Sequence, residues 1–255
     1  MNSMQKPLVS VIMPAYNAEK YISKAIASVQ QQTIENWELI VIDDCSGDGT
    51  AEVVAGFAQA DSRIRFLKNE QNSGVARTRN RGIEVCTGEY VAFLDSDDIW
   101  HPEKLECQIK CLQENNGDLS YTSYSIVDHM GKQQCADFVV PETVDFDGLL
   151  KENVIGCSTV VVKSAQVKAR GFEEDFFHED YVLWLQLLQA GCKFVGVRQV
   201  LVDYFFHLDS KAGNKRRSAQ MRWQIYRSYL KLSLGKSLWY FAHYALAGFR
   251  KYKKV

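Results

Sequence analysis

The chain has 255 residues, of which 46% are hydrophobic and 24% are charged, and its formal net charge is −1. This composition is typical of a globular protein with a substantial core, and it excludes a disordered chain and a coiled coil. No uncharged apolar stretch reaches the roughly 20 residues that span a bilayer, and MNSMQKPLVS has no apolar signal-peptide run, so we expect a cytoplasmic protein.

Four short apolar runs in the first half predict β-strands. They are LVSVIM (8–13), ELIVID (38–43), RIRFL (63–67) and YVAFL (90–94). Runs that are apolar on both faces are typical of parallel strands buried on both sides. Helical patterns follow each run, namely AEKYISKAIASVQQQ, GTAEVVAGFAQ, GVARTRNRGIEVC and HPEKLECQIKCLQEN. The alternation predicts an α/β fold: a Rossmann-like, mostly parallel central sheet flanked by helices.

The second half has a less regular pattern. LSYTSYSIVD (119–128) alternates like a half-exposed strand, and NVIGCSTVVVK predicts a loop that enters another strand. EDYVLWLQLLQAGC (179–192) predicts an amphipathic helix that ends at Gly191. KFVGV and VLVDYFF predict two further strands. The seven cysteines lack paired CxxC spacing, so we expect buried reduced thiols.

A polar cluster follows each of the first four predicted strands. The clusters are PAYN (14–17), DDCSGDGT (43–50), NEQNSG (69–74) and DSDD (95–98). In open parallel sheets ligands bind beyond the carboxyl ends of the strands, and all four clusters fall on that edge. The sequence therefore predicts a ligand site there.

The carboxylates of these clusters each have two interpretations, one functional and one structural. Asp95 and Asp97 offer the hard oxygen ligands that Mg²⁺ or Mn²⁺ prefers, or they belong to a solvated turn in which Asp98 caps the next helix. Asp43 and Asp44 would accept hydrogen bonds from a nucleobase edge or ribose hydroxyls, whereas SGDGT after them is a turn and helix cap. Tyr16 either stacks on a base or packs on the sheet edge.

Basic and acidic groups mark the starts of two later helices. The helix that follows Gly74 carries Arg79 between two other arginines, a pattern that favours phosphate or an exposed face. GxGxxG and GxxxxGK[ST] are both absent, which argues against a dinucleotide site and a P-loop. Glu179 and Asp180 begin a helix, where they either complement its dipole or supply a general base. His207 is either a third metal ligand or a packed histidine.

The C-terminal segment differs in charge from the rest. Residues 211–255 contain twelve Lys or Arg and no acidic residue, so residues 1–210 hold 18 basic and 31 acidic residues, a net charge of −13. KSLWYFAHYALAGFRKYKKV places aromatic residues between basic clusters, which predicts a basic helical tail at a membrane interface. The alternative is a helix packed on the catalytic domain or on a second subunit. No nucleic-acid motif accompanies the charge.

Four linked segments resemble family 2 glycosyltransferases of the GT-A fold. They are VSVIMPAYNAEKYISKAIASVQQQT, WELIVIDDCSGDGT, NSGVARTRNRGIE and GEYVAFLDSDDIWHPEKL, in order over the first 115 residues or so. The chain also resembles the smaller bacterial members that build capsule or O-antigen chains, and IGCSTVVV and HEDYVLWLQLL resemble their acceptor-side region. The resemblance implies a GT-A catalytic domain over 1–210, with nucleotide-sugar-binding (1–115) and acceptor-side (116–210) halves, and a separate tail over 211–255.

The resemblance also implies an inverting transfer from a nucleotide-diphosphate sugar, with a UDP-sugar favoured, to a glycan or lipid-linked glycan. Asp44 would contact the base, Asp97 would be the principal ligand of Mn²⁺ or Mg²⁺ with Asp95 beside it and His207 third, and Asp180 of the Glu179–Asp180 pair would be the base. The donor site would comprise Pro14, Ala15, Tyr16, Asn17, Asp43, Asp44, Gly74, Arg79, Asp95 and Ser96.

Several alternatives stay open at this stage. AQMRW (219–223) is only a partial match to the QxxRW motif of the polymer-making members, so processive synthesis is not expected. A nucleotidyltransferase, or a non-catalytic protein that binds nucleotide sugars or glycans, would share the nucleotide-binding sheet. We expect a cytoplasmic enzyme whose tail reaches the inner face of the plasma membrane, and the sequence leaves its oligomeric state open.

Overall fold

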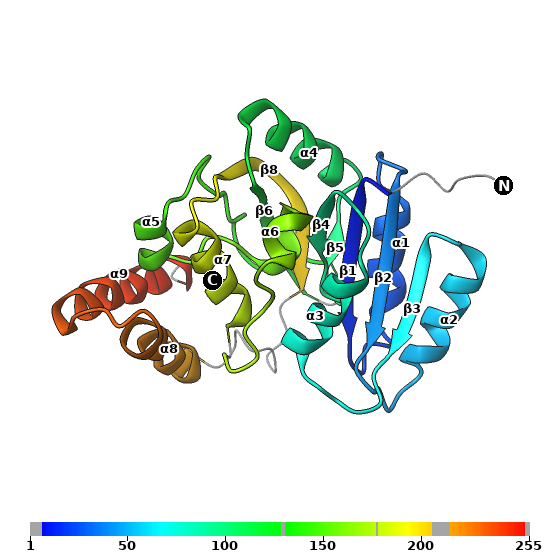
Figure 1. Cartoon of the computed structure of the whole chain (residues 1–255), viewed down its shortest axis with the longest axis horizontal. Coiled ribbons are helices and arrows are strands. Elements are labelled where there is room, and N and C mark those ends of the chain that lie inside the picture. Colours follow the sequence, from blue (N-terminus) through cyan, green and yellow to red (C-terminus); the bar gives the residue numbers. More distant parts are fainter. Residues whose placement is uncertain (1–6, 129–130, 177, 206–214, 253–255) are drawn as a thin grey trace.

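A mixed β-sheet with helices on both faces forms the body of the protein (Figure 1). The computed structural model describes residues 7–128, 131–176, 178–205 and 215–252. Within these residues the sheet has eight strands in the order β3-β2-β1-β4-β7-β6-β8-β5. One face packs on α1, α2 and α4, and the other packs on α3, α6 and α7.

The bounds of the elements are as follows. The strands are β1 (Val9–Ala15), β2 (Trp37–Asp43), β3 (Ile64–Lys68), β4 (Tyr90–Phe93), β5 (Ile99–Trp100), β6 (Leu119–Val127), β7 (Val161–Lys163) and β8 (Phe194–Phe205). The helices are α1 (Ile22–Gln30), α2 (Thr50–Ala60), α3 (Val75–Val85), α4 (Lys104–Asn115), α5 (Phe146–Lys151), α6 (Ser164–Lys168), α7 (Glu179–Gln189), α8 (Lys215–Gln224) and α9 (Leu234–Tyr252).

The first half confirms the predicted parallel sheet. β1 pairs in parallel with β2 and β4, and β2 pairs in parallel with β3. Every residue of β1 and β2 is buried. Alternate side chains enter two different cores, so that Ile12 faces the α3 and α7 side while Val11 and Met13 face the α1 side. Burial on both faces explains why these strands appear as continuous apolar runs.

The second half corrects two strand predictions. KFVGV and VLVDYFF form one strand, β8, which runs parallel to β6. The register jumps from Val197 to Val200 opposite neighbouring residues of β6, so Arg198 and Gln199 form a bulge rather than a turn. β6 was predicted to be half-exposed, but it is mostly buried because both sheet faces are covered there. β7 is antiparallel to β4 and β6, which makes the sheet mixed.

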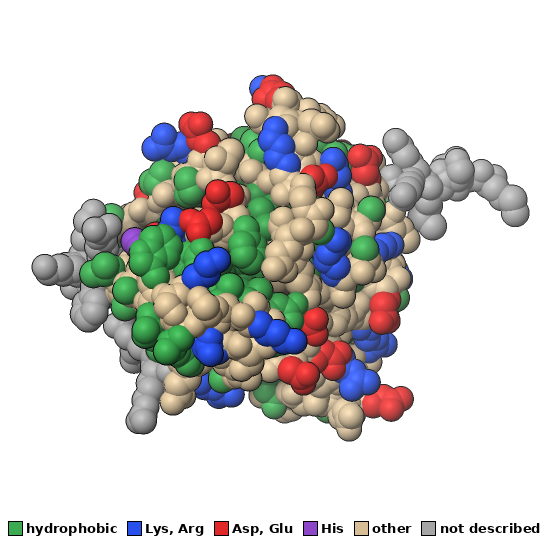
Figure 2. Space-filling view, turned by 60° about the vertical axis from the view of Figure 1, so that its left-hand side comes forward, with side chains coloured by type: hydrophobic (Ala, Val, Ile, Leu, Met, Phe, Trp, Pro, Cys, Tyr) green, Lys and Arg blue, Asp and Glu red, His purple; other side chains and the backbone are tan. Residues whose placement is uncertain are grey.

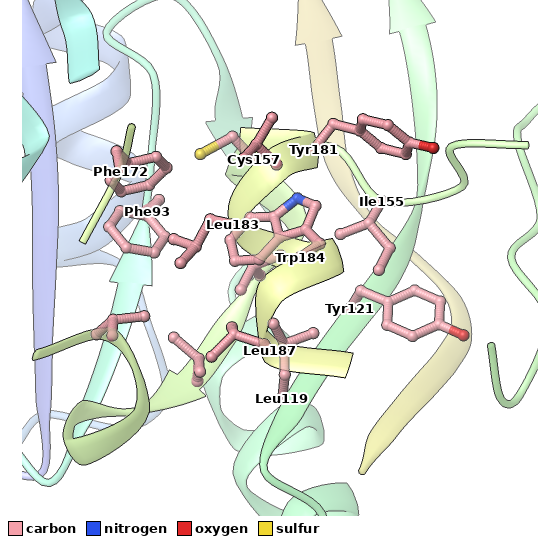
Figure 3. Packing of buried hydrophobic residues seen from close by; sticks show 14 of the residues in the cluster. Phe93, Leu119, Tyr121, Ile155, Cys157, Phe172, Tyr181, Leu183, Trp184 and Leu187 are labelled. Atoms are coloured by element: carbon pink, nitrogen blue, oxygen red, sulfur yellow. The ribbon is translucent and has the colours of Figure 1, made fainter. Parts of the chain in front are cut away.

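Helix α7 is buried on nearly all sides, whereas the sequence pattern predicted an amphipathic helix. Trp184 lies 6.3 Å from Phe93 and 6.4 Å from Phe172, measured between ring centroids. Figure 3 shows Leu183, Trp184 and Leu187 of this helix among the side chains of the core. The prediction failed because a second layer covers the side that faces away from the sheet. The predicted end at Gly191 is confirmed, since this residue has φ +83°.

The second layer is a helical arm, residues 215–252, made of α8, a π-helical turn (Ile225–Tyr229) and α9. It confirms the predicted C-terminal helical tail. Tyr226 Oη donates to Leu150 O at 2.6 Å, and Gln186 Nε2 donates to Tyr229 Oη at 2.6 Å. Tyr240 Oη also donates to Asp147 of α5. The inner face of the arm is therefore hydrogen-bonded to α5 and α7. This agrees with the alternative prediction that the tail is a helix packed on the catalytic domain.

A membrane-spanning helix is not present in the part of the chain that the structure describes: none of its helices combines the necessary length and hydropathy.

Candidate active site

The first two polar loops are bonded to each other at the carboxyl edge of the sheet. Asn17, which has φ +50°, donates from its backbone N to Ser46 Oγ at 2.9 Å and accepts from Gly47 N at 2.9 Å. Pro14 and Ala15 are buried in β1, and Tyr16 is 53% exposed beside them. Tyr16 is therefore not packed against the sheet edge, and its ring is accessible to a ligand; stacking on a base stays a prediction.

Asp44 supports a loop in this structure. Its Oδ1 accepts from Asn69 Nδ2 at 2.7 Å and from Ser73 N at 2.9 Å, and its Oδ2 accepts from Gly74 N at 2.8 Å. Asp44 therefore fixes the NEQNSG loop, and Gly74 at its end adopts φ +83°, a conformation that favours glycine. The base contact that the resemblance implies for Asp44 would have to share these oxygens.

Asp43, in contrast, is short of donors. It is fully buried at the end of β2, and its Oδ1 accepts from Ser46 N at 3.0 Å. Its Oδ2 lies 3.7 Å from Lys68 Nζ and accepts no hydrogen bond from any residue that the structure describes. A buried carboxylate oxygen without a donor is costly, so Asp43 is suited to accept one from a ligand.

The acidic run contains one carboxyl group with a purely structural role. Asp98 is buried, and it accepts from Ser158 Oγ and from Phe205 N. The prediction that it caps the next helix is wrong, because α4 begins only after Glu103. Burial, and then the charges of Asp97 and Asp95, raise the pKa of Asp98 well above its usual range. A protonated Asp98 reduces the charge repulsion in the run, while Asp95, Ser96 and Asp97 stay half-buried at the edge.

Arg79 joins the two halves of the site. Its Nη2 donates to Asp95 Oδ1 at 2.6 Å, and its Nη1 donates to Glu179 Oε1 at 2.7 Å. The guanidinium is only 4% exposed and lies 5.3 Å from the centroid of the Phe172 ring. Arg79 was predicted to favour phosphate at a helix N-terminus, but in this structure two carboxylates occupy it. Of the three arginines of this helix, Arg77 is the exposed one.

Asp180 is poised to take up a proton near neutral pH. It is half-buried beside Glu179, and its Oδ1 accepts from its neighbour Tyr181 N at 2.7 Å. Burial, and next the charge of Glu179, raise the pKa of Asp180 to about 6, although Arg79 acts in the opposite direction. A general base is most effective when its pKa lies near the working pH.

Ser158 is a site residue that the sequence did not reveal. Its Oγ donates to Asp98 and accepts from Asp95 N at 3.1 Å, while its carbonyl accepts from Trp100 Nε1 at 2.8 Å. Ser158 therefore sets the path of the whole acidic run. The segment IGCSTVVV was recognised as an acceptor-side element, but a single serine carries no signature of this role. Burial raises the pKa of the adjacent Cys157 well above its usual value, so its thiol stays protonated.

The residues predicted to hold a metal ion are partly described. Asp95 and Asp97 lie together at the sheet edge, whereas His207 lies outside the described residues. No group of three or more His, Cys, Asp or Glu side chains among the described residues forms a metal site by itself. Arg79 binds Oδ1 of Asp95, and no described residue donates a hydrogen bond to its Oδ2. Two carboxylates fit Mg²⁺ or Mn²⁺, which usually completes its coordination with substrate phosphates and water.

Comparisons with known proteins identify the family of this chain. The family described as "Glycosyl transferase family 2" matches residues 10–134. The chain is 38% identical over 254 residues to WfgD of Escherichia coli, a UDP-Glc:alpha-D-GlcNAc-diphosphoundecaprenol beta-1,3-glucosyltransferase. This alignment covers 98% of the present chain and 96% of WfgD. It is 37% identical over 246 residues to TuaG of Bacillus subtilis (strain 168), whose name places it in teichuronic acid biosynthesis. That alignment covers 96% of the present chain and 98% of TuaG.

Solved structures show the same fold at low sequence identity. TarS of S. aureus in complex with UDP-GlcNAc superposes with a TM-score of 0.74 at 21% identity, over 95% of this chain and 72% of that one. The mannosyltransferase PcManGT of Pyrobaculum calidifontis, in complex with GDP-Man and Mn²⁺, superposes with a TM-score of 0.70 at 19% identity, over 90% and 66%. The chain is therefore an enzyme of the GT-A fold and belongs to glycosyltransferase family 2.

Proposed function

We propose that this enzyme transfers a sugar from a nucleoside-diphosphate sugar, with a UDP-sugar favoured, to a hydroxyl group of a lipid-linked glycan during assembly of a bacterial surface polysaccharide. The relatives support this: WfgD uses UDP-Glc and a diphosphoundecaprenol-linked GlcNAc, and TuaG is assigned to teichuronic acid. Such an acceptor would bring the enzyme to the cytoplasmic face of a membrane.

The observation that carries the proposal is the double ion pair of Arg79. It holds Asp95, at the end of the donor-side sheet, and Glu179, at the start of the acceptor-side helix, on one guanidinium. Asp180 is the next residue along that helix. Asp180, the proposed base, therefore lies near the carboxylates that we expect to face the diphosphate, and this supports a direct displacement at the anomeric carbon.

The proposed reaction is a single displacement. Asp180 accepts the proton of the acceptor hydroxyl, whose oxygen attacks the anomeric carbon of the donor. The bond between that carbon and the diphosphate oxygen breaks, and the nucleoside diphosphate leaves with the electron pair. Because attack and departure occur on opposite faces of the sugar, the configuration inverts.

Binding of the donor involves the sheet edge. Tyr16 is exposed for stacking on the base, and Oδ2 of Asp43, which accepts no hydrogen bond from a described residue, is an acceptor for the nucleoside. Asp97 and Asp95 would hold Mn²⁺ or Mg²⁺, which supplies Lewis-acid stabilisation of the charge on the leaving diphosphate. Arg79 keeps Asp95 in place for this role, since its second ion pair with Glu179 anchors it.

The test combines donor binding with transfer. Nucleotide sugars are screened by thermal unfolding with Mn²⁺ and with EDTA, because a bound donor stabilises the folded state. Asp180→Asn should retain donor binding and lose about 10²–10⁴-fold in transfer rate. Asp97→Ala should lose the Mn²⁺-dependent part of donor binding.

Asp175→Asn, an exposed carboxyl five positions upstream of Asp180, is the matched control and should leave the rate unchanged. Unchanged transfer by Asp180→Asn would refute its role as the base. Release of inorganic pyrophosphate in place of a nucleoside diphosphate would instead identify a nucleotidyltransferase, and donor binding without any turnover would identify a binding protein.

A further inference from the structure

Helix α9 presents an apolar face to solvent. Leu234, Leu238 and Leu246 are each more than half exposed, and Trp239 is 49% exposed. Leu234, Leu238, Ala242 and Leu246 follow one another at intervals of four residues, so they share one face of the helix, with Trp239 at its border. The face that packs on the body lies opposite and carries the buried Ser237 and the half-buried Tyr240.

This is the reverse of an ordinary surface helix, whose solvent face is charged or polar. A contiguous exposed apolar surface usually marks an interaction site. On the side turned forward in Figure 2, hydrophobic side chains gather together with lysines and arginines. The inner contacts of the arm are already made with α5 and α7, so the outward face of α9 has no role in holding the arm on the body.

Positive charge lies at the N-terminal end of this apolar face. Lys231 and Lys236 are exposed just before and in the first turn of α9, and Arg227 is exposed in the preceding π-helical turn. Lys151 Nζ also lies 5.0 Å from the centroid of the Trp239 ring, although it is paired with Asp147 of its own helix. The whole segment 211–255 contains twelve basic residues and no acidic one. An apolar stripe with aromatic and basic borders has the composition of a helix that lies in the plane of an anionic lipid surface.

We propose that the outward face of α9 docks this enzyme on an anionic lipid bilayer, with Leu238, Trp239 and Leu246 entering the headgroup region and the basic residues meeting lipid phosphates. The helix lies on the surface and does not cross it, since no described helix is suited to spanning. A second copy of the chain is the less suitable occupant, because two arms without a single acidic residue would repel each other.

The docked arm would also fix the distance between the bilayer and the active site. The inner face of the arm contacts α7, the helix that begins with Glu179 and Asp180. Tyr240 of α9 bonds to Asp147 on the neighbouring α5. The docked helix and the proposed base therefore belong to one packed unit, so that Asp180 would keep a fixed distance from the bilayer. A fixed distance suits an acceptor that is anchored in the lipid.

The experiment is flotation of the purified full-length protein with vesicles. Vesicles of phosphatidylglycerol and phosphatidylcholine should carry the protein upward, and phosphatidylcholine alone should not. Binding should weaken in high salt because exposed charges are screened. The double variant Leu238→Glu, Leu246→Glu should reduce the bound fraction about tenfold or more. Tryptophan fluorescence should shift to the blue on binding, and less so in Trp239→Phe, which separates Trp239 from the four other tryptophans.

Val139→Glu is the matched control, because Val139 is 52% exposed but lies in the loop between β6 and α5, away from the arm. The double variant and the Val139→Glu control must both unfold at the same midpoint as the wild-type protein, so that a loss of flotation is not a loss of folding. Equal flotation of the double variant and the control would overturn the proposal, as would wild-type protein that stays with the soluble fraction. A wild-type dimer that the double variant converts to monomer would assign the face to a second copy. The flotation assay contains no sugar donor, so a negative result would refute membrane docking without bearing on the proposed transfer reaction.

Discussion

Two internal contacts of this protein are each built around a buried arginine, and they are built differently. The site contact joins the donor-side sheet to α7 through Arg79, which pairs with two carboxylates. The arm contact joins α8 to α7 through Arg222, which lies 3.5 Å over the ring of Tyr181 and 5.0 Å from that of Tyr244. No acidic side chain pairs with Arg222 in the part of the chain that the structure describes.

The difference separates a contact that depends on charge from one that depends on aromatic burial. At the site contact three acidic groups, Asp95, Glu179 and Asp180, surround one guanidinium, so removal or protonation of any group alters the others. At the arm contact Nε and Nη1 of Arg222 have no hydrogen-bond partner among the described residues, and the rings of Tyr181 and Tyr226 supply the burial. We therefore expect chemistry and pH to act on the first contact and to spare the second.

The largest effect is expected from Arg79→Met. The substitution keeps an apolar side chain of similar length but leaves two carboxylates near each other without their cation. Loss of one partner of a buried ion pair typically costs about 3–5 kcal/mol. The free energy of unfolding, measured by urea denaturation, should fall by that amount, and transfer should be lost because Asp95 is no longer held.

Arg77→Met is the control for this prediction, since Arg77 lies on the same helix two residues earlier and is exposed. It should change stability by no more than about 0.5 kcal/mol. If both variants unfolded at the same urea concentration, the carboxylates would be adequately solvated without Arg79, and the site contact would not depend on charge.

The pH dependence of transfer comes next. The pKa of Asp180 is raised to about 6 by burial and then by the charge of Glu179. Because the carboxylate form accepts the proton, the rate should fall about tenfold per pH unit below that value. Glu179→Gln removes the neighbouring negative charge, so the acid limb of the profile should move to lower pH, as measured by steady-state rates from pH 4.5 to 8.

The contribution of Asp180 to the free energy of unfolding should change with pH in the opposite direction to the transfer rate. The folded state binds the Asp180 proton more tightly than the unfolded state does, so this group destabilises the fold progressively as pH rises from about 4 to 6. Asp180→Asn should therefore raise the free energy of unfolding at pH 7, by at most about 3 kcal/mol, and change it little at pH 4. A variant that is less stable at pH 7 would show that Asp180 is stabilising as a carboxylate.

The sequence predicted the donor-side half well for a physical reason. β1, β2 and β4 are buried on both faces, so most of their positions are apolar, and each polar loop begins where a strand ends. The predicted strands 8–13, 38–43 and 90–94 agree with β1, β2 and β4 to within two residues. The edge that collects Asp43, Asp44 and Asp95 follows from this parallel order alone.

The acceptor-side half was harder because its elements are short and its partners are distant. α5 and α6 have only six and five residues and are too short to show a period. The pairings of Arg79 with Glu179, and of Ser158 with Asp98, span 100 and 60 residues of sequence. Local propensity carries no information about such contacts. The arm changed the pattern of α7 in the same way, by covering a face that the sequence assigned to solvent.

The smallest effect is expected from Arg222→Met in the arm contact. A guanidinium whose Nε and Nη1 lack hydrogen-bond partners among the described residues contributes mainly through its contact with the rings of Tyr181 and Tyr244. Such a contact is worth about 0.5–2 kcal/mol when desolvated. Its removal also relieves the cost of burying an unpaired cation, so the two terms nearly cancel. Stability should change by no more than about 1 kcal/mol in urea denaturation at any pH from 5 to 8, with transfer retained. A loss as large as that of Arg79→Met would mean that an anion reaches Arg222, and the contrast between the two arginines would disappear.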